Sequence, residues 1–207
     1  ASKGAAEVIF HGYASSFFEN DDVRLATARA GNVIGGGDWS KDRIVVDCMT
    51  RWARHELVEI RSPSATRPWQ HVLEPLSGYL MLGAALNARR DLHGEAFNFG
   101  PRSEVPITVE QLLWDLAKSW GQGSFDCNYS VTDNIPFNEA GLLKLNCDKA
   151  LFRLGWEANL TYQECVEFVG GWYLEYFKGQ RDMRDLTRDQ IKKYEGMAIS
   201  RGLKWTI

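Results

Sequence analysis

Apolar positions at the start of the chain follow a helical spacing. They recur every three or four residues, at Ala5, Val8, Ile9, Tyr13 and Phe17. This spacing predicts a helix to about Phe18, and the polar run 19–22 predicts a turn after it. The small and apolar residues of 23–30 then predict a buried strand of the kind found in parallel sheets. A helix followed by such a strand indicates an α/β unit.

The remaining pattern is mainly helical. It predicts strands over 57–60, 69–73 and 96–99 and helices over 45–55, 75–86, 109–120, 147–154, 161–177 and 187–200. Thr108 is expected to cap one helix with Gln111 at the capping-box position, and Thr161 is expected to open another. The glycine-rich run 31–39 is expected to be a loop outside the carboxyl end of a strand, where ligands bind in open α/β sheets.

Composition and charge exclude several classes of protein. The 207 residues are 44% hydrophobic and 25% charged, with a net charge of -3 and scattered basic residues, so nucleic acid is not an expected partner. The sequence has no apolar run near the roughly 18 residues of a membrane span and no signal segment, so a cytoplasmic protein without membrane contact is expected. The four cysteines lie far apart without ligand spacing, and we expect no metal site. The opening residues are typical of the middle of a helix, which suggests part of a longer protein.

Single residues give ambiguous signals. The triplet 35–37 suits a tight turn or a phosphate cradle. Arg67 could clamp a pyrophosphate or form a surface ion pair, and His71 could be a core histidine or a catalyst. Taken separately, these residues indicate only an α/β domain, whereas their order and spacing carry more information.

Four segments together resemble the extended short-chain dehydrogenase/reductase family. Ser2-Lys3, a small-residue helix, a strand and then the run 29–35 resemble the second half of that family's signature. The run 66–74, T-R-P-W-Q-H-V-L-E, looks like R-D-W-x-Y-V-x-D. Residues 97–100 look like Y-N-I-G, and 145–156 look like the closing D-x-x-K-A…L-G-W element. The matches stand in family order and cover most of the chain.

The resemblance implies an α/β fold with two domains. Residues 1–35 would be the end of a Rossmann NAD-binding domain whose N-terminal part is missing. Residues 36–207 would be mainly a smaller mixed α/β, largely helical, nucleotide-sugar-binding domain, with about 70–90 returning to the Rossmann domain.

Within this family the runs G-N-V-I-G-G-G-D-W and R-P-W-Q-H-V-L-E-P-L-S-G-Y look most like the branch that dehydrates CDP-glucose. That implies a lyase that uses NAD to oxidise the sugar at C4, eliminates water from C5 and C6, and returns the hydride to C6. The branch is linked to dideoxyhexoses of bacterial lipopolysaccharide O-antigen.

Site residues carry over from the same resemblance. Lys3 would match the lysine of Y-x-x-x-K, with the tyrosine two residues before Ala1; it would hydrogen-bond the nicotinamide ribose and lower the tyrosine pKa. Ala30, Gly31 and Val33 would lie near the nicotinamide. The predicted substrate-binding residues are Asn32, Arg43, Arg67, His71 and Glu139. The glycine-rich dinucleotide loop and the acid and base of dehydration would lie outside these residues.

Other functions fit the same pattern. A sister epimerase or reductase on this scaffold is one alternative, and a non-catalytic nucleotide-sugar-binding module is another. In the family the helix that carries the lysine packs against its twin, so a homodimer or homotetramer is expected.

Overall fold

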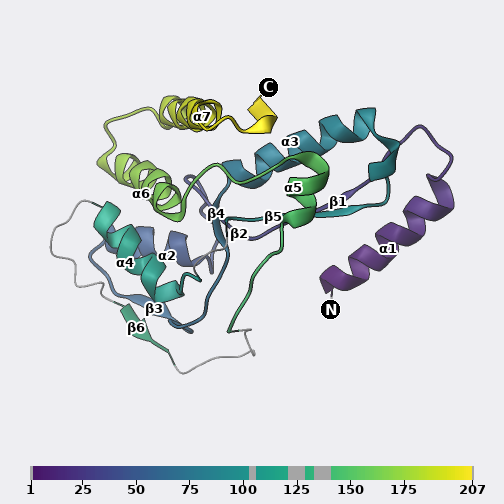
Figure 1. The fold of residues 1–207 in the computed structure, drawn as a ribbon. Coiled ribbons are helices and arrows are strands. Elements are labelled where there is room, and N and C mark those ends of the chain that lie inside the picture. The colour runs from purple at the N-terminus through teal and green to yellow at the C-terminus, as the bar shows by residue number, and fades with distance from the viewer. Residues whose placement is uncertain (1, 103–105, 121–128, 133–140, 207) are drawn as a thin grey trace.

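The computed structural model describes residues 2–102, 106–120, 129–132 and 141–206 (Figure 1). Its helices are α1 (Ser2–Phe17), α2 (Ile44–Trp52), α3 (Leu73–Ala88), α4 (Val109–Ser119), α5 (Asp148–Leu154), α6 (Tyr162–Lys178) and α7 (Met183–Ser200), with 3-10 turns η1 (Arg90–Leu92) and η2 (Lys204–Thr206). Its strands are β1 (Thr27–Ala30), β2 (Asn32–Ile34), β3 (Val58–Ile60), β4 (Trp69–His71), β5 (Ala96–Phe99) and β6 (Tyr129–Val131). The α/β class predicted from the sequence is confirmed.

Most predicted elements lie within a few residues of those observed, and the exceptions have local causes. Residues 32–34 form β2, where the glycine-rich pattern predicts a loop. Helix α7 begins at Met183 and not at Thr187, because the side chain of Asp182 caps it by accepting from the amides of Arg184 and Asp185. The start predicted at Thr187 is therefore wrong, and its hydroxyl donates to the carbonyl of Met183 at 2.7 Å.

Gly31 is the point at which the chain passes from one pair of strands to another. Strand β1 pairs in parallel with β5, and β2 pairs in parallel with β4. The amide of Gly31 donates to the carbonyl of Phe99 at 3.3 Å, and the next amide, that of Asn32, donates to the carbonyl of Pro68 at 3.0 Å. A Cβ at Gly31 would lie 2.6 Å from the same Pro68 oxygen, so only glycine fits here.

The apolar core is divided into separate clusters. The largest lies among α2, β3, α4 and α6; it includes Val45, Met49, Ile60, Leu113, Val169 and Tyr173. A second cluster joins α3, β5 and α5; it includes Leu82, Phe97, Phe99, Ala150 and Trp156. In Figure 1 the two sets of elements lie on the left and right of the molecule. The domain boundaries stay a prediction, and the second cluster leads us to expect that β5 and α5 also lie with the Rossmann part.

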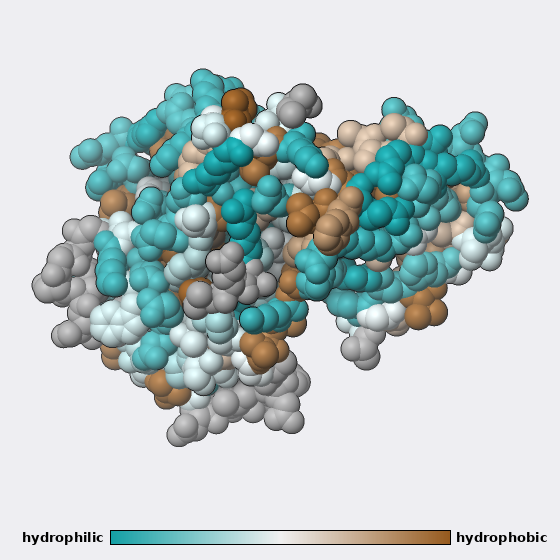
Figure 2. All heavy atoms as spheres, viewed as in Figure 1, coloured by the Kyte–Doolittle hydropathy of each residue, from teal (hydrophilic) through white to brown (hydrophobic). Residues whose placement is uncertain are grey.

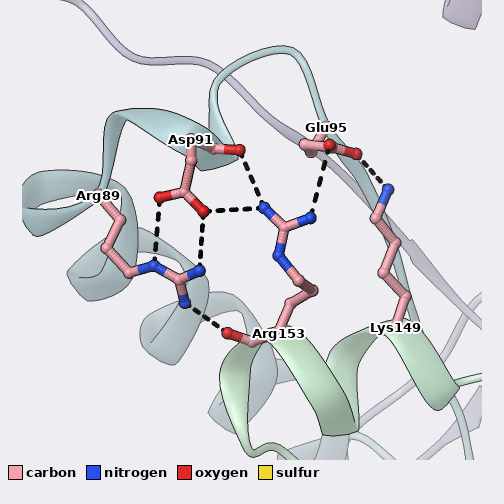
Figure 3. A network of polar contacts seen from close by, with 5 residues as sticks. All are labelled: Arg89, Asp91, Glu95, Lys149 and Arg153. Carbon is pink, nitrogen blue, oxygen red and sulfur yellow. Dashed lines mark hydrogen bonds and ion pairs between the residues drawn. The ribbon is translucent and has the colours of Figure 1, made fainter.

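A network of charged side chains connects α5 to the turn before β5 (Figure 3). Asp91 accepts from Arg89 at 2.8 Å and from Arg153 at 2.9 Å. Glu95 pairs with Lys149 and lies 3.8 Å from Arg153. Hydrogen bonds from Arg89 and then from Arg153 lower the pKa of Asp91. The side chains are partly exposed, so salt will screen these pairs.

A buried carboxylate connects α3 to the start of α6. Glu74 is almost fully buried, and its two oxygens accept from the amides of Leu160 at 2.6 Å and Asn159 at 2.9 Å. The hydroxyl of Tyr194 on α7 donates to the same carboxyl at 3.1 Å. Burial raises the pKa of Glu74, while these hydrogen bonds oppose that rise. One acceptor on α3 therefore binds the residues before α6 and a side chain of α7.

Helix α1 covers little of the structure described. Among its residues that can be described only Ala14 is buried, whereas Val8 is 73% exposed and Phe17 67% exposed. Apolar residues, brown in Figure 2, reach the surface in the part of the molecule on the right, where α1 lies in Figure 1. The packing of this face against a second copy stays a prediction.

Close packing of α3 on β5 depends on Gly78, where a Cβ would lie 2.2 Å from the ring of Phe99. We expect Gly78→Ala to lower the free energy of unfolding by about 1–3 kcal/mol, because the core must shift. Gly83→Ala on the same helix meets no atom within 4 Å; it should leave stability unchanged or raise it by up to about 1 kcal/mol. Urea unfolding of both variants measures this, and equal stabilities would contradict the packing argument.

Candidate functional site

A cavity of about 700 Å³ opens where β1 passes into β2. Its walls are the chain from Ala30 to Gly35, the first turn of α2, the end of β3 and one residue of α6, Tyr173. This volume is within the range of cavities that hold nucleotides and other small ligands.

Six of the residues predicted from the sequence line this cavity: Ala30, Gly31, Asn32, Val33, Arg43 and Arg67. They come from β1, β2, the turn before α2 and the segment before β4. Lys3 and His71 do not line it, and Glu139 lies outside the described residues. The predicted roles of all these residues stay predictions.

Arginine side chains are among the groups that line the cavity. Arg43 precedes α2, and no side chain caps that helix, whose first residues, Ile44 to Val46, also line the cavity. Uncapped amides at a helix N-terminus and arginine side chains both favour anions. Arg67 holds its backbone in place through its own amide, which donates to the carbonyl of Ile107 at 3.2 Å. These groups suit an anionic ligand such as a diphosphate.

Acidic side chains that the sequence analysis missed also line the cavity, and they are Asp38, Asp42, Asp47 and Glu59. Burial, and then the charge of Asp42, raises the pKa of Asp47. Asp42 lies 4.0 Å from Arg61. Glu59 faces away from the core because β3 alternates buried and exposed residues. These carboxyls can accept hydrogen bonds from hydroxyl or amino groups of a ligand. No sequence signal distinguishes them from ordinary surface charges.

His71 is a core residue by position. Its side chain is buried, its Nδ1 accepts from the amide of Leu73 at 3.3 Å, and its ring packs edge-on against Phe168. Burial lowers the pKa of His71 to about 4. A neutral imidazole in this place fits a packing role, and its contact with substrate stays a prediction.

The position of Lys3 on α1 can be inferred from Glu7, which lies one helical turn later. Glu7 forms two short hydrogen bonds to Arg29 of β1, of 2.7 and 2.6 Å, and Arg29 also donates to Asn98 of β5 at 3.1 Å. Residues four apart share one face of a helix, so Lys3 is on the face of α1 that Glu7 directs toward β1. Lys3 precedes Glu7, which places it toward the N-terminal end of α1.

Within the described ranges, no group of three or more His, Cys, Asp or Glu side chains is arranged to hold a metal ion. The expected absence of a metal stays a prediction. None of the helices in the described part of the chain is long and apolar enough to cross a membrane.

Sequence comparison links this chain to one curated enzyme. It is 38% identical over 198 residues to a CDP-glucose 4,6-dehydratase from Salmonella typhimurium, covering 93% of this chain and 54% of the relative. The chain thus spans about half the length of the curated relative it matches. No family model matches it.

Structural comparison adds solved structures with the same fold. A dTDP-glucose 4,6-dehydratase from Streptomyces venezuelae with NAD bound matches with a TM-score of 0.70 at 16% identity, over 88% of this chain and 52% of that chain. One from Bacillus anthracis in complex with NAD gives 0.68 at 15% identity, over 86% and 52%. A UDP-glucuronic acid 4-epimerase from Bacillus cereus, in complex with UDP-glucuronic acid and NAD, gives 0.67 at 16%, over 84% and 50%.

The burial of His71 leads us to expect that the free energy of unfolding depends on pH in the acid range. The folded pKa of His71 is about 4 and its ordinary value is 6.5, so between these values the unfolded chain binds more protons. Stability should therefore fall as pH drops from 6.5 to 4, by roughly 3 kcal/mol from this residue. His71→Asn keeps an acceptor but removes the titration, and denaturant unfolding across this pH range should show a flatter slope than the parent chain. An unchanged slope would contradict it.

Proposed function

We propose that this chain, which corresponds in sequence to the C-terminal half of a CDP-glucose 4,6-dehydratase and has the fold of nucleotide-sugar dehydratases and epimerases, forms the substrate-binding part of such an enzyme. The complete polypeptide converts CDP-glucose to CDP-4-keto-6-deoxyglucose with NAD as cofactor. It works in the cytoplasm as a homodimer or homotetramer.

One observation carries this proposal: residues predicted from three separate stretches of sequence, 30–33, 43 and 67, line a single cavity large enough for a nucleotide sugar. Asn32, Arg43 and Arg67 are polar or cationic members of that lining. A diphosphate carries negative charge that arginines bind in a bidentate manner. The uncapped start of α2 supplies amide donors to the same region.

The acidic lining suits the rest of the substrate. Glucose and ribose present hydroxyl donors, and cytosine presents an amino donor. Carboxylates such as those of Glu59 and Asp47 can accept hydrogen bonds from these groups. Glu139 remains our candidate for the ribose or base. The cavity thus combines donors for an anion with acceptors for sugar and base.

The residues that would hold NAD fit at the point where β1 ends. Gly31 has no side chain, and Val33 is an exposed apolar residue in the cavity wall, so with Ala30 they offer apolar contact to a flat ring. The chemistry that NAD would supply here, when bound, is hydride acceptance from sugar C4 and hydride return to C6. Oxidation at C4 acidifies the proton on C5 and permits loss of water from C5 and C6.

Lys3 would hold the nicotinamide ribose and act on the tyrosine of the complete polypeptide. A nearby ammonium favours the phenolate, which lowers the tyrosine pKa and allows it to take the proton of the C4 hydroxyl. The 207 residues contain neither a glycine-rich dinucleotide loop nor the Y-x-x-x-K tyrosine, so turnover is proposed for the complete polypeptide alone.

The activity is tested with the complete polypeptide, NAD and four donors: CDP-glucose, dTDP-glucose, UDP-glucose and GDP-mannose. We expect the alkali-induced absorbance of a 4-keto-6-deoxy sugar from CDP-glucose only. A C4-epimerised or reduced sugar without keto product would favour a sister enzyme, and binding of CDP-glucose without NAD or turnover would favour a non-catalytic module.

The role of the cavity arginine is tested by Arg67→Lys in the complete enzyme. Lysine keeps the charge but loses the planar fork, so KM for CDP-glucose should rise by about 10-fold or more. Arg188→Lys on α7 is the matched control, because Arg188 is 63% exposed and does not line the cavity. Steady-state kinetics measure both, and equal KM values for the two variants would argue against phosphate binding by Arg67.

A further inference from the structure

One helix far along the sequence contacts the wall of the cavity. The segment 35–39, called here the glycine segment, connects β2 to the turn before α2, and its residues Gly35 and Asp38 line the cavity. Helix α6 lies against this segment. Tyr173 is the α6 residue that also reaches the cavity lining.

The contact between α6 and the glycine segment includes a partly buried hydrogen bond. Tyr173 is fully buried, and its hydroxyl donates to the backbone carbonyl of Asp38 at 2.7 Å. The carboxylate of Asp38 accepts a hydrogen bond from the amide of Ser40 at 2.9 Å. Burial raises the pKa of Tyr173 to about 12, so the hydroxyl keeps its proton and remains a donor.

Aromatic rings of α6 also pack against the glycine segment on either side of Asp38, at Gly36 and at Trp39. A Cβ at Gly36 would lie 2.1 Å from the ring of Trp172, so the backbone lies directly on that ring. Trp39 packs on α6 with ring centroids 4.7 Å from Tyr176 and 5.4 Å from Tyr173. The indole of Trp172 donates to Thr187 of α7 at 3.0 Å, which ties this contact to the next helix.

We propose that Tyr173 is a positioning residue that fixes the glycine segment as a wall of the nucleotide-sugar cavity. This rests on the proposed function. The hydroxyl fixes the carbonyl of Asp38, and the rings fix the residues on either side, so the cavity keeps the shape that binds substrate. Tyr173 acts on substrate affinity through the segment and takes no part in proton or hydride transfer.

The test compares Tyr173→Phe with Tyr194→Phe in the complete enzyme. Both remove one hydroxyl from a buried tyrosine, but the hydroxyl of Tyr194 bonds to Glu74 and Ser77, away from the cavity. We expect Tyr173→Phe to raise KM for CDP-glucose about 3–10-fold with little change in kcat, since one neutral hydrogen bond to the segment is lost. Tyr194→Phe should leave KM unchanged. Calorimetric titration with CDP-glucose should show the same loss of affinity, and thermal denaturation reports the stability of each variant.

A second pair of variants, at two tryptophans, distinguishes positioning of the segment from direct contact with substrate. This pair tests the proposal if Tyr173→Phe does not fold. Trp39 and Trp114 are 44% and 40% exposed, and neither lines the cavity. Trp39→Leu loosens the segment from α6 and should raise KM, whereas Trp114→Leu on α4 should not.

An unchanged KM in Trp39→Leu, or an equal rise in Tyr194→Phe, would overturn the positioning role. These outcomes presuppose that the parent enzyme gives keto product from CDP-glucose. If the parent gives none from any donor, it is the proposed function that fails.

Discussion

The carboxylate of Glu74 accepts hydrogen bonds from the amides of Asn159 and Leu160 and from the hydroxyl of Tyr194. It is nearly fully buried, and the two backbone amides give each of its oxygens a donor even without the hydroxyl of Tyr194. Asn159 adds a hydrogen bond from its side-chain amide to the carbonyl of Tyr194 at 2.8 Å. The entry of the chain into α6 is therefore fixed by α3 on one side and α7 on the other.

The position of α6 determines the shape of the candidate site. Thr161 and Glu164 close a capping box at its start, directly after the residues that Glu74 holds. Three turns later the same helix carries Trp172 and Tyr173 to the segment that walls the cavity. The helix whose start is held in the core therefore also carries the residues that contact the glycine segment.

The other side of the site depends on the crossing at Gly31. Because β1 pairs with β5 and β2 with β4, residues on either side of Gly31 belong to different strand pairs, and the residues from Ala30 to Gly35 line the cavity. The exposed apolar face of α1 belongs to the same part of the molecule. Its Glu7–Arg29 pair is partly exposed and is a modest anchor for the helix that carries Lys3.

The sequence by itself determined the order and kind of the helices and the class of fold, because helix periodicity and caps are local patterns. Six residues of the cavity lining came from its resemblance to a known family. It also predicted the resemblance that the comparison with a CDP-glucose 4,6-dehydratase confirms. Only the tertiary structure decided that β2 leaves β1 at Gly31, that His71 is buried, and that Tyr173 meets Asp38. Residues 38 and 173 are far apart along the chain, and a contact between them depends on how α3, α6 and α7 pack around Glu74. Because this packing does not depend on the spacing of residues that are close in sequence, the pattern of apolar and polar positions could not predict the contact.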